Sequence, residues 1–140
     1  MNSSTTGVMF NTSSDYRLKE NVVPMTGSID RLKALKPSRF NFIADADTTV
    51  DGFLAHEAQE VVPEAISGEK DAMKMEEYEV TPAVMDGETV VTEAVMGERE
   101  VPDYQGIDQA KLVPLLTSAL QDAIEKIEKL ESRITAMEVS

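Results

Sequence analysis

The stretch LTSALQDAIEKIEKLESRITAM, residues 116–137, decides the fold more than any other part of this 140-residue chain. Its apolar residues recur at alternating steps of four and three, which is the repeat of a helix that buries one narrow stripe in a coiled coil. We call this stripe the seam, and its members are Leu116, Leu120, Ala123, Ile127, Leu130, Ile134 and Met137. The pattern predicts a long coiled-coil helix within residues 107–140.

The residues beside the seam indicate what it packs against. In a parallel coiled coil, Lys126 and Arg133 would face Glu131 and Glu138 of the next chain, and both pairs are opposite in charge. Isoleucine and leucine at alternate seam positions favour two strands, but the small Ala123 leaves room for three. The alternative is an ordinary amphipathic helix that packs on its own domain, since the seam spans only about three heptads.

Residues 67–106 differ in character from the rest of the chain. The segment 80–85, VTPAVM, is repeated as VTEAVM at 91–96, and Asp86-Gly87 between the copies is a strong hairpin-turn signal. No basic residue lies between Met75 and Glu98. The content of Thr, Val and Met predicts an acidic β-hairpin arm that needs a partner surface. A partly disordered acidic loop is the alternative.

Residues 14–66 carry signals for a small core of helices and strands. Ser28 is expected to cap a short helix that runs to about Leu35. The alternation at 39–43 predicts a strand, and the polar residues 45–52 then form a hairpin loop. A second short helix is expected from His56, closed by Pro63. The fold class expected for the whole chain is α+β: a small core, a protruding arm and a long C-terminal helix.

Composition and spacing exclude several classes of function. A formal net charge of −13 argues against nucleic acid and against an anionic membrane surface as partners. The chain has no cysteine, and no apolar run is long enough to span a membrane. His56 is the only histidine, and Glu60 stands where a zinc protease needs its second one. We therefore expect no metal and no cofactor, and we reject a metal-dependent hydrolase at His56.

A serine and a lysine near the N-terminus could form a nucleophile and its base. A lysine can take the proton of Ser14 only if its neutral form is favoured by desolvation or by nearby positive charge. Arg17 would favour that form of Lys19, whereas Asp15 and Glu20 would oppose it. A spacing of five puts the two side chains on opposite faces of a strand and well off one face of a helix. A turn after Ser14, or a lysine from a neighbouring chain, would be needed to pair them.

Four blocks of sequence carry a resemblance to a known family: Ser14-Asp15-x-Arg17-x-Lys19-Glu20-Asn21, Leu32-x-x-Leu35-Lys36-Pro37, Gly52-Phe53-Leu54-Ala55-x-Glu57-x-Gln59-Glu60-Val61-x-Pro63-Glu64-Ala65, and Tyr104-x-x-Ile107. Together they resemble the intramolecular chaperone auto-processing domain at the C-terminus of phage endosialidases, tailspikes and tail fibres. The resemblance covers roughly residues 14–137. One departure is His56, where many relatives would carry glutamine.

The resemblance implies a homotrimeric chaperone that helps an upstream fibre or spike of the same polypeptide to fold and then cuts itself off. The bond cut would be Ser13–Ser14, with Ser14 as nucleophile and Lys19 as base. Asp15 and Arg17, which lie between them in the sequence, are candidate supporting residues. Residues 1–13 would then be the end of the released fibre, and 14–66 the auto-processing core. The implied location is the host cell cytoplasm during virion assembly, with release from the mature fibre after cleavage. The alternative is a structural trimerisation or attachment module that does not cleave.

Overall fold

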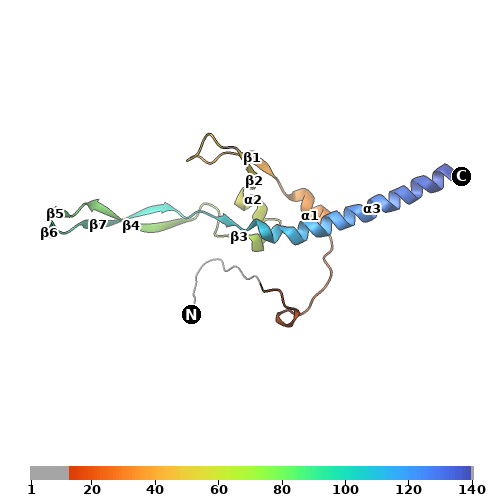
Figure 1. The fold of residues 1–140 in the computed structure, drawn as a ribbon, viewed down its shortest axis with the longest axis horizontal. Coiled ribbons are helices and arrows are strands. Elements are labelled where there is room, and N and C mark those ends of the chain that lie inside the picture. Colours follow the sequence, from red (N-terminus) through yellow and green to blue (C-terminus); the bar gives the residue numbers. More distant parts are fainter. Residues whose placement is uncertain (1–12, 140) are drawn as a thin grey trace. The chain divides into compact units, whose positions relative to one another are not determined.

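Helices and strands both contribute to the structure, a computed structural model that describes residues 13–139. The α+β class predicted from the sequence is confirmed, and the chain ends in a long helix (Figure 1). The chain divides into two compact units, of which one comprises the residues up to Ser67 and from Ile107 onward. The other unit is the segment Gly68–Gly106.

The first unit is assembled from short elements and one long helix. Its only hairpin among the described residues pairs β1 with β2 in antiparallel register, with Arg39 opposite Asp51. A hairpin was predicted here, but residues 50–52 of the predicted loop form β2, and β1 ends at Phe40. Strand β3 pairs with β8. The elements are η1 (Tyr16–Leu18), α1 (Ser28–Ala34), β1 (Ser38–Phe40), β2 (Val50–Gly52), α2 (Ala55–Gln59), η2 (Pro63–Ala65), β3 (Ile66–Ser67), β8 (Gly106–Ile107), η3 (Gln109–Leu112) and α3 (Val113–Val139).

A small apolar core holds this unit together. Helix α1 packs against α3 (Figure 1), and the side chain of Leu115 on α3 is only 2% exposed. Partly buried side chains such as Phe53 and Ile107 pack around the core. The buried residues of the core are Leu35, Ala58, Val62, Ala65, Leu112 and Leu115. The start of α3 is therefore fixed to the rest of its unit by its own buried side chains.

Truncation of Leu115 tests the position of this core. Leu115→Ala should lower the free energy of unfolding by about 2–5 kcal/mol, because a buried leucine is replaced by a cavity. Urea unfolding followed by circular dichroism measures the loss. Leu54→Ala is the matched control, since Leu54 is 48% exposed and should cost less than about 1 kcal/mol. Equal losses in the two variants would contradict the core described here.

Two local predictions were wrong. Ser28 does not cap α1, because Gly27 is the N-cap residue, with a left-handed φ of 70°. The buried Ser28 hydroxyl instead lies 2.7 Å from the Ser118 hydroxyl on α3, so it joins two helices. Pro63 does not end the second helix, which ends at Gln59. It begins η2, because a proline is tolerated at the start of a helical turn, where no amide donor is needed.

The second unit is a long two-stranded ribbon. Strand β4 (Met73–Thr81) pairs with β7 (Val95–Pro102), and β5 (Val84–Asp86) pairs with β6 (Thr89–Thr92), all antiparallel. The two copies of the repeat pair with each other, and Gly87 at the turn has a φ of 64° that suits glycine. The repeat therefore predicts its own pairing correctly.

The two faces of the ribbon differ in charge balance. On one face, the Arg99 guanidinium lies 4.7 Å from the centre of the Tyr78 ring and 2.7 Å from a carboxylate oxygen of Glu76. On the other, Glu77 lies directly opposite Glu98. Like charges directly opposite each other destabilise a two-stranded sheet. The Glu77–Glu98 pair is therefore expected to weaken the pairing of these two strands.

Candidate active site

A single tight turn brings the predicted nucleophile and base together. The amides of Leu18 and Lys19 donate to the carbonyls of Asp15 and Tyr16, each at 3.1 Å, and close the 3-10 turn η1. The chain folds back on itself there, and Lys19 Nζ lies 2.6 Å from Ser14 Oγ. In a strand or a helix, a spacing of five would keep these two side chains apart. The turn brings them together within one chain.

The side chains of Asp15 and Arg17 are joined inside the same turn. Asp15 Oδ1 accepts hydrogen bonds from the Arg17 amide at 2.8 Å and from Arg17 Nε at 2.9 Å. Asp15 Oδ2 accepts from Arg17 Nη2 at 2.9 Å. These bonds hold the pKa of Asp15 below its ordinary value and raise the pKa of Arg17. The positive charge of Arg17 is therefore compensated locally and does not act alone on its neighbours.

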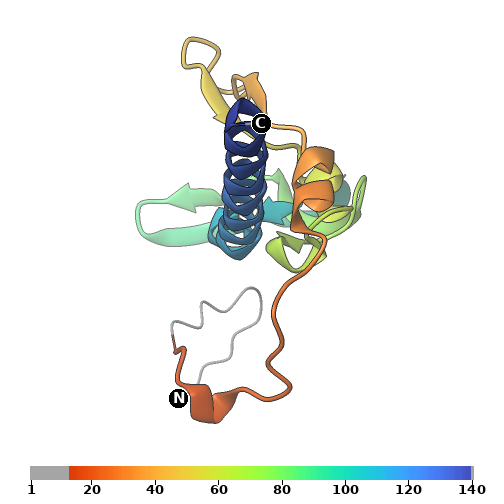
Figure 2. The same cartoon turned by 90° about the vertical axis from the view of Figure 1, so that its right-hand side faces the viewer.

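The turn lies on an exposed segment. Ser13, Ser14 and Lys19 are all exposed. From the turn to α1, the chain runs as an extended segment with neither helix nor strand (Figure 2), and Val22 on it is 80% exposed. Ser13 begins the described residues, so residues 1–12 of the fibre end predicted at 1–13 lie outside them. In a single chain, water has access to both members of the Ser14–Lys19 pair.

The seam residues all lie on α3, and most of them are exposed. Leu120 is 62% exposed and Ile127 is 55% exposed. The helix uses a different, neighbouring stripe to pack on its own unit, made of Leu115 and Ala119, and Leu112 of η3 continues it. This second stripe was not predicted, although its steps of three and four from Leu112 are present in the sequence. In the single chain, most of the seam is therefore exposed to solvent and does not contribute to the core of its unit.

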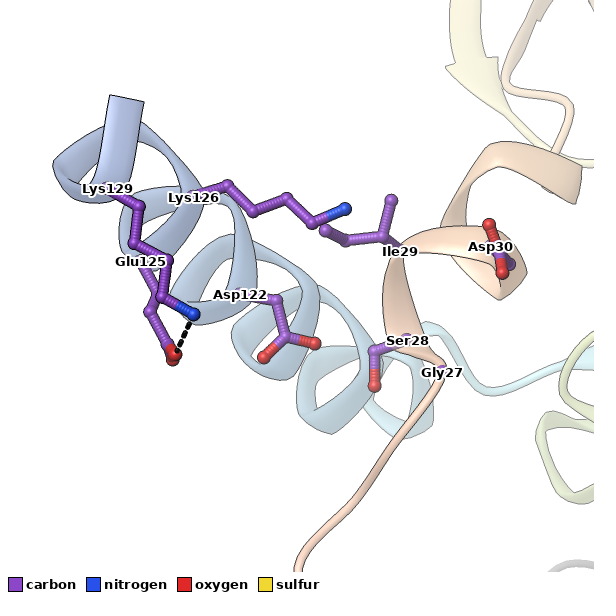
Figure 3. Close-up of a pocket in the computed structure, with 8 residues that line it drawn as sticks. All are labelled: Gly27, Ser28, Ile29, Asp30, Asp122, Glu125, Lys126 and Lys129. Carbon is purple, nitrogen blue, oxygen red and sulfur yellow. Dashed lines mark ion pairs between the residues drawn. The ribbon is translucent and has the colours of Figure 1, made fainter. Parts of the chain in front are cut away.

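A hollow beside the contact of α1 and α3 does not include the predicted site. It has a volume of about 260 Å³ and is lined by Gly27–Asp30 and by four charged residues of α3 (Figure 3). Two of these, Glu125 and Lys129, form an ion pair at 3.4 Å. Neither Ser14 nor Lys19 lines this hollow. Its lining carries both signs of charge, which gives it no preference for one charged ligand.

Among the described residues, neither a metal site nor a membrane-spanning helix is found. No group of three or more His, Cys, Asp or Glu side chains among them could hold a metal ion. His56 lies in α2 and is half-buried, and Glu60 follows as the C-terminal cap of that helix. None of the helices in the described part of the chain has the length and apolar character needed to cross a bilayer.

The exposed turn coincides with the start of a family match. The model of the family described as chaperone of endosialidase matches residues 14–67. The match covers less than half of the 140-residue chain, and over that segment the chain is similar to the family. The resemblance predicted from the sequence is therefore confirmed, and the matched segment begins at Ser14, holds Lys19, and ends with strand β3.

A solved structure extends the likeness beyond the matched segment. It is described as a novel intramolecular chaperone, and it aligns with 81% of this chain and 99% of its own with a TM-score of 0.51. The two sequences are 18% identical over this alignment, so the likeness shows the fold alone. No curated protein matches the chain. The shared fold includes more of the chain than the segment that defines the family.

Proposed function

We propose that this chain is an intramolecular chaperone that helps an upstream phage tail fibre or tailspike of the same polypeptide to trimerise and fold. It then releases itself by cutting the bond between Ser13 and Ser14. The observation that carries the cleavage is the 2.6 Å contact of Lys19 Nζ with Ser14 Oγ, at the very start of the family match. The family match itself supports the chaperone role.

The chemistry follows from the position of the two side chains. In the arrangement described, the Lys19 ammonium donates to Ser14 Oγ, and a neutral amine at the same place would instead accept the hydroxyl proton. The freed oxygen attacks the carbonyl carbon of Ser13, and the proton passes to the Ser14 nitrogen as the C–N bond breaks. The product is an ester between Ser13 and the Ser14 oxygen. Water then hydrolyses this ester to a Ser13 carboxylate and a restored Ser14 hydroxyl, so each chain cuts once.

Exposure of the pair supports a link between cleavage and assembly. A solvated lysine stays protonated at neutral pH, and desolvation favours its neutral form. In one chain, Ser14 and Lys19 are both exposed. We propose that neighbouring chains cover this turn once the trimer has formed, which would make cleavage a checkpoint on assembly.

The exposed seam supports the homotrimer. A stripe with Ile127 and Leu120 more than half exposed is stabilised by burial against copies of itself. The stripe at Leu115 and Ala119 is already buried, and it packs α3 against its own unit. This division counts against the alternative that the seam packs on its own domain. The small Ala123 leaves room for a third helix.

The proposed partners and location follow from this role. The chaperone acts on the fibre or spike that precedes it in the same polypeptide, and it does so in the host cell cytoplasm during virion assembly. After cleavage it is absent from the mature fibre. The acidic arm, whose Glu77 and Glu98 face each other, is the part suited to contact that fibre.

A second function remains a candidate because the exposed seam would also suit a trimeric attachment module that never cleaves. Intact mass spectrometry of the purified wild-type chain under denaturing conditions separates the two. The chaperone reading predicts one fragment that ends at Ser13 and one that starts at Ser14. A wild-type chain that stays whole over days would favour the attachment module and contradict the self-release proposed here.

A further inference from the structure

The turn at residues 14–19 is held by both backbone and side-chain hydrogen bonds. The backbone closes the turn with only two amide hydrogen bonds, both at 3.1 Å. The side chain of Asp15 adds three more, all to Arg17 and all at 2.8–2.9 Å. Short isolated helical turns are unstable because few hydrogen bonds offset the loss of backbone freedom. The bonds to Asp15 therefore add to the order that the two backbone bonds give this turn.

The geometry joins these bonds to the proposed chemistry. Asp15 follows Ser14 directly, and its Oδ1 caps the turn by accepting from the Arg17 amide. Lys19 ends the same turn and reaches back to Ser14. Because Lys19 is a long side chain on an exposed segment, many of its rotamers point away from Ser14. The approach of Lys19 to Ser14 depends on the direction that the backbone takes through the turn.

We infer that Asp15 and Arg17 are positioning residues for self-cleavage: their side-chain clamp holds the turn that places Lys19 Nζ on Ser14 Oγ. This inference rests on the proposed function, because it assigns roles at the same site. The clamp also makes the pair electrically neutral beside the lysine. It therefore fixes the geometry without a net charge that would act on the proton transfer.

The ionisable side chains of this segment are Asp15, Tyr16, Arg17, Lys19 and Glu20. Arg17 holds the pKa of Asp15 below its ordinary value. A depressed carboxyl pKa contributes stability that is present above the unfolded value near 3.9 and is lost as the pH falls through the folded value. The clamp is therefore intact over the whole neutral range, where cleavage would be measured.

Rates of cleavage in the full chain test the positioning role. Asp15→Ala removes the cap and the ion pair and should slow cleavage by about two- to thirtyfold, which is the range of stability lost with an N-cap converted to a rate. Asp15→Asn keeps an oxygen that can cap the turn and should recover part of the rate. Asp51→Ala is the matched control, because it removes a similar exposed pair with Arg39, at 2.8 Å, far along the sequence.

The pH at which the cleavage rate is half-maximal adds a readout that a purely structural role would not move. Asp15→Ala leaves the Arg17 charge uncompensated near the lysine, so cleavage should reach half its maximum at lower pH than in the wild type. Arg17→Ala leaves the Asp15 carboxylate uncompensated and should move this midpoint to higher pH. Shifts in opposite directions support the clamp.

Three outcomes are decisive. Cleavage of Asp15→Ala at the wild-type rate would overturn the inference and leave self-release intact. Equal midpoints in both alanine variants would also overturn it. An uncut wild-type chain would contradict the proposed function and remove the inference with it. Circular dichroism and sedimentation of each variant show that it keeps its helices and its oligomeric state, so that slow cleavage is not loss of folding.

Discussion

Replacement of Ser14 by alanine should abolish release of the N-terminal fragment, with the cleavage rate lowered by about a thousandfold or more. The reason is that the proposed attack on the Ser13 carbonyl uses Ser14 Oγ, which lies 2.6 Å from Lys19 Nζ. Lys19→Arg should have a similar effect, since a guanidinium keeps the charge but cannot serve as a base at neutral pH. Intact mass spectrometry over time measures both rates.

The adjacent serine provides the control for this pair of variants. Ser13→Ala changes the residue on the other side of the scissile bond and keeps the nucleophile, so cleavage should persist. Lys33→Arg makes the same substitution at an exposed lysine of α1, away from the turn in the sequence. Continued cleavage of Ser14→Ala at an unchanged rate would exclude Ser14 as the nucleophile.

Insertion of a charge into the seam should have the second large effect. Ile127→Asp should convert trimers to monomers, because a trimer would bury three carboxylates in one layer, each at a cost of several kcal/mol. Ile127 is 55% exposed in the single chain, so folding of the monomer should be unaffected. Light scattering measures the mass of the assembly, and cleavage should slow with the loss of trimers.

A charge placed on the outer face of the same helix is the matched control for the seam. Ser132→Asp adds the same carboxylate outside the seam, at an exposed position of α3. It should leave the trimer intact and the cleavage rate unchanged. If Ile127→Asp were monomeric and still cleaved at the full rate, cleavage would not depend on assembly, and the proposed checkpoint would be wrong.

The elements predicted most accurately were those with a periodic sequence pattern. The seam predicts α3, and the repeat with Asp86-Gly87 predicts the hairpin of the arm, because both depend on local patterns that recur over many residues. The stripe at Leu115 and Ala119 was missed because it lies beside a longer and more regular stripe. Ser28 was misread for a different reason: its partner, Ser118, lies 90 residues away.

The contact between Ser14 and Lys19 could not be predicted from the sequence. Ser14 and Lys19 could be chosen as nucleophile and base by resemblance, but the spacing of five gave no reason for them to meet. Their approach depends on the dihedral angles of one short turn and on the side chain of Asp15 that caps it. Asp15 and Arg17 were expected only to support the site, and their bidentate contact forms within that turn.

Native mass spectrometry of the wild-type chain tests the central claim most directly, because it reads the number of chains in each assembly and the mass of every chain in the same sample. We predict trimers whose chains begin at Ser14, and monomers whose chains are still whole. Trimers of uncut chains that persist over days, or cut chains that were never trimeric, would contradict the account.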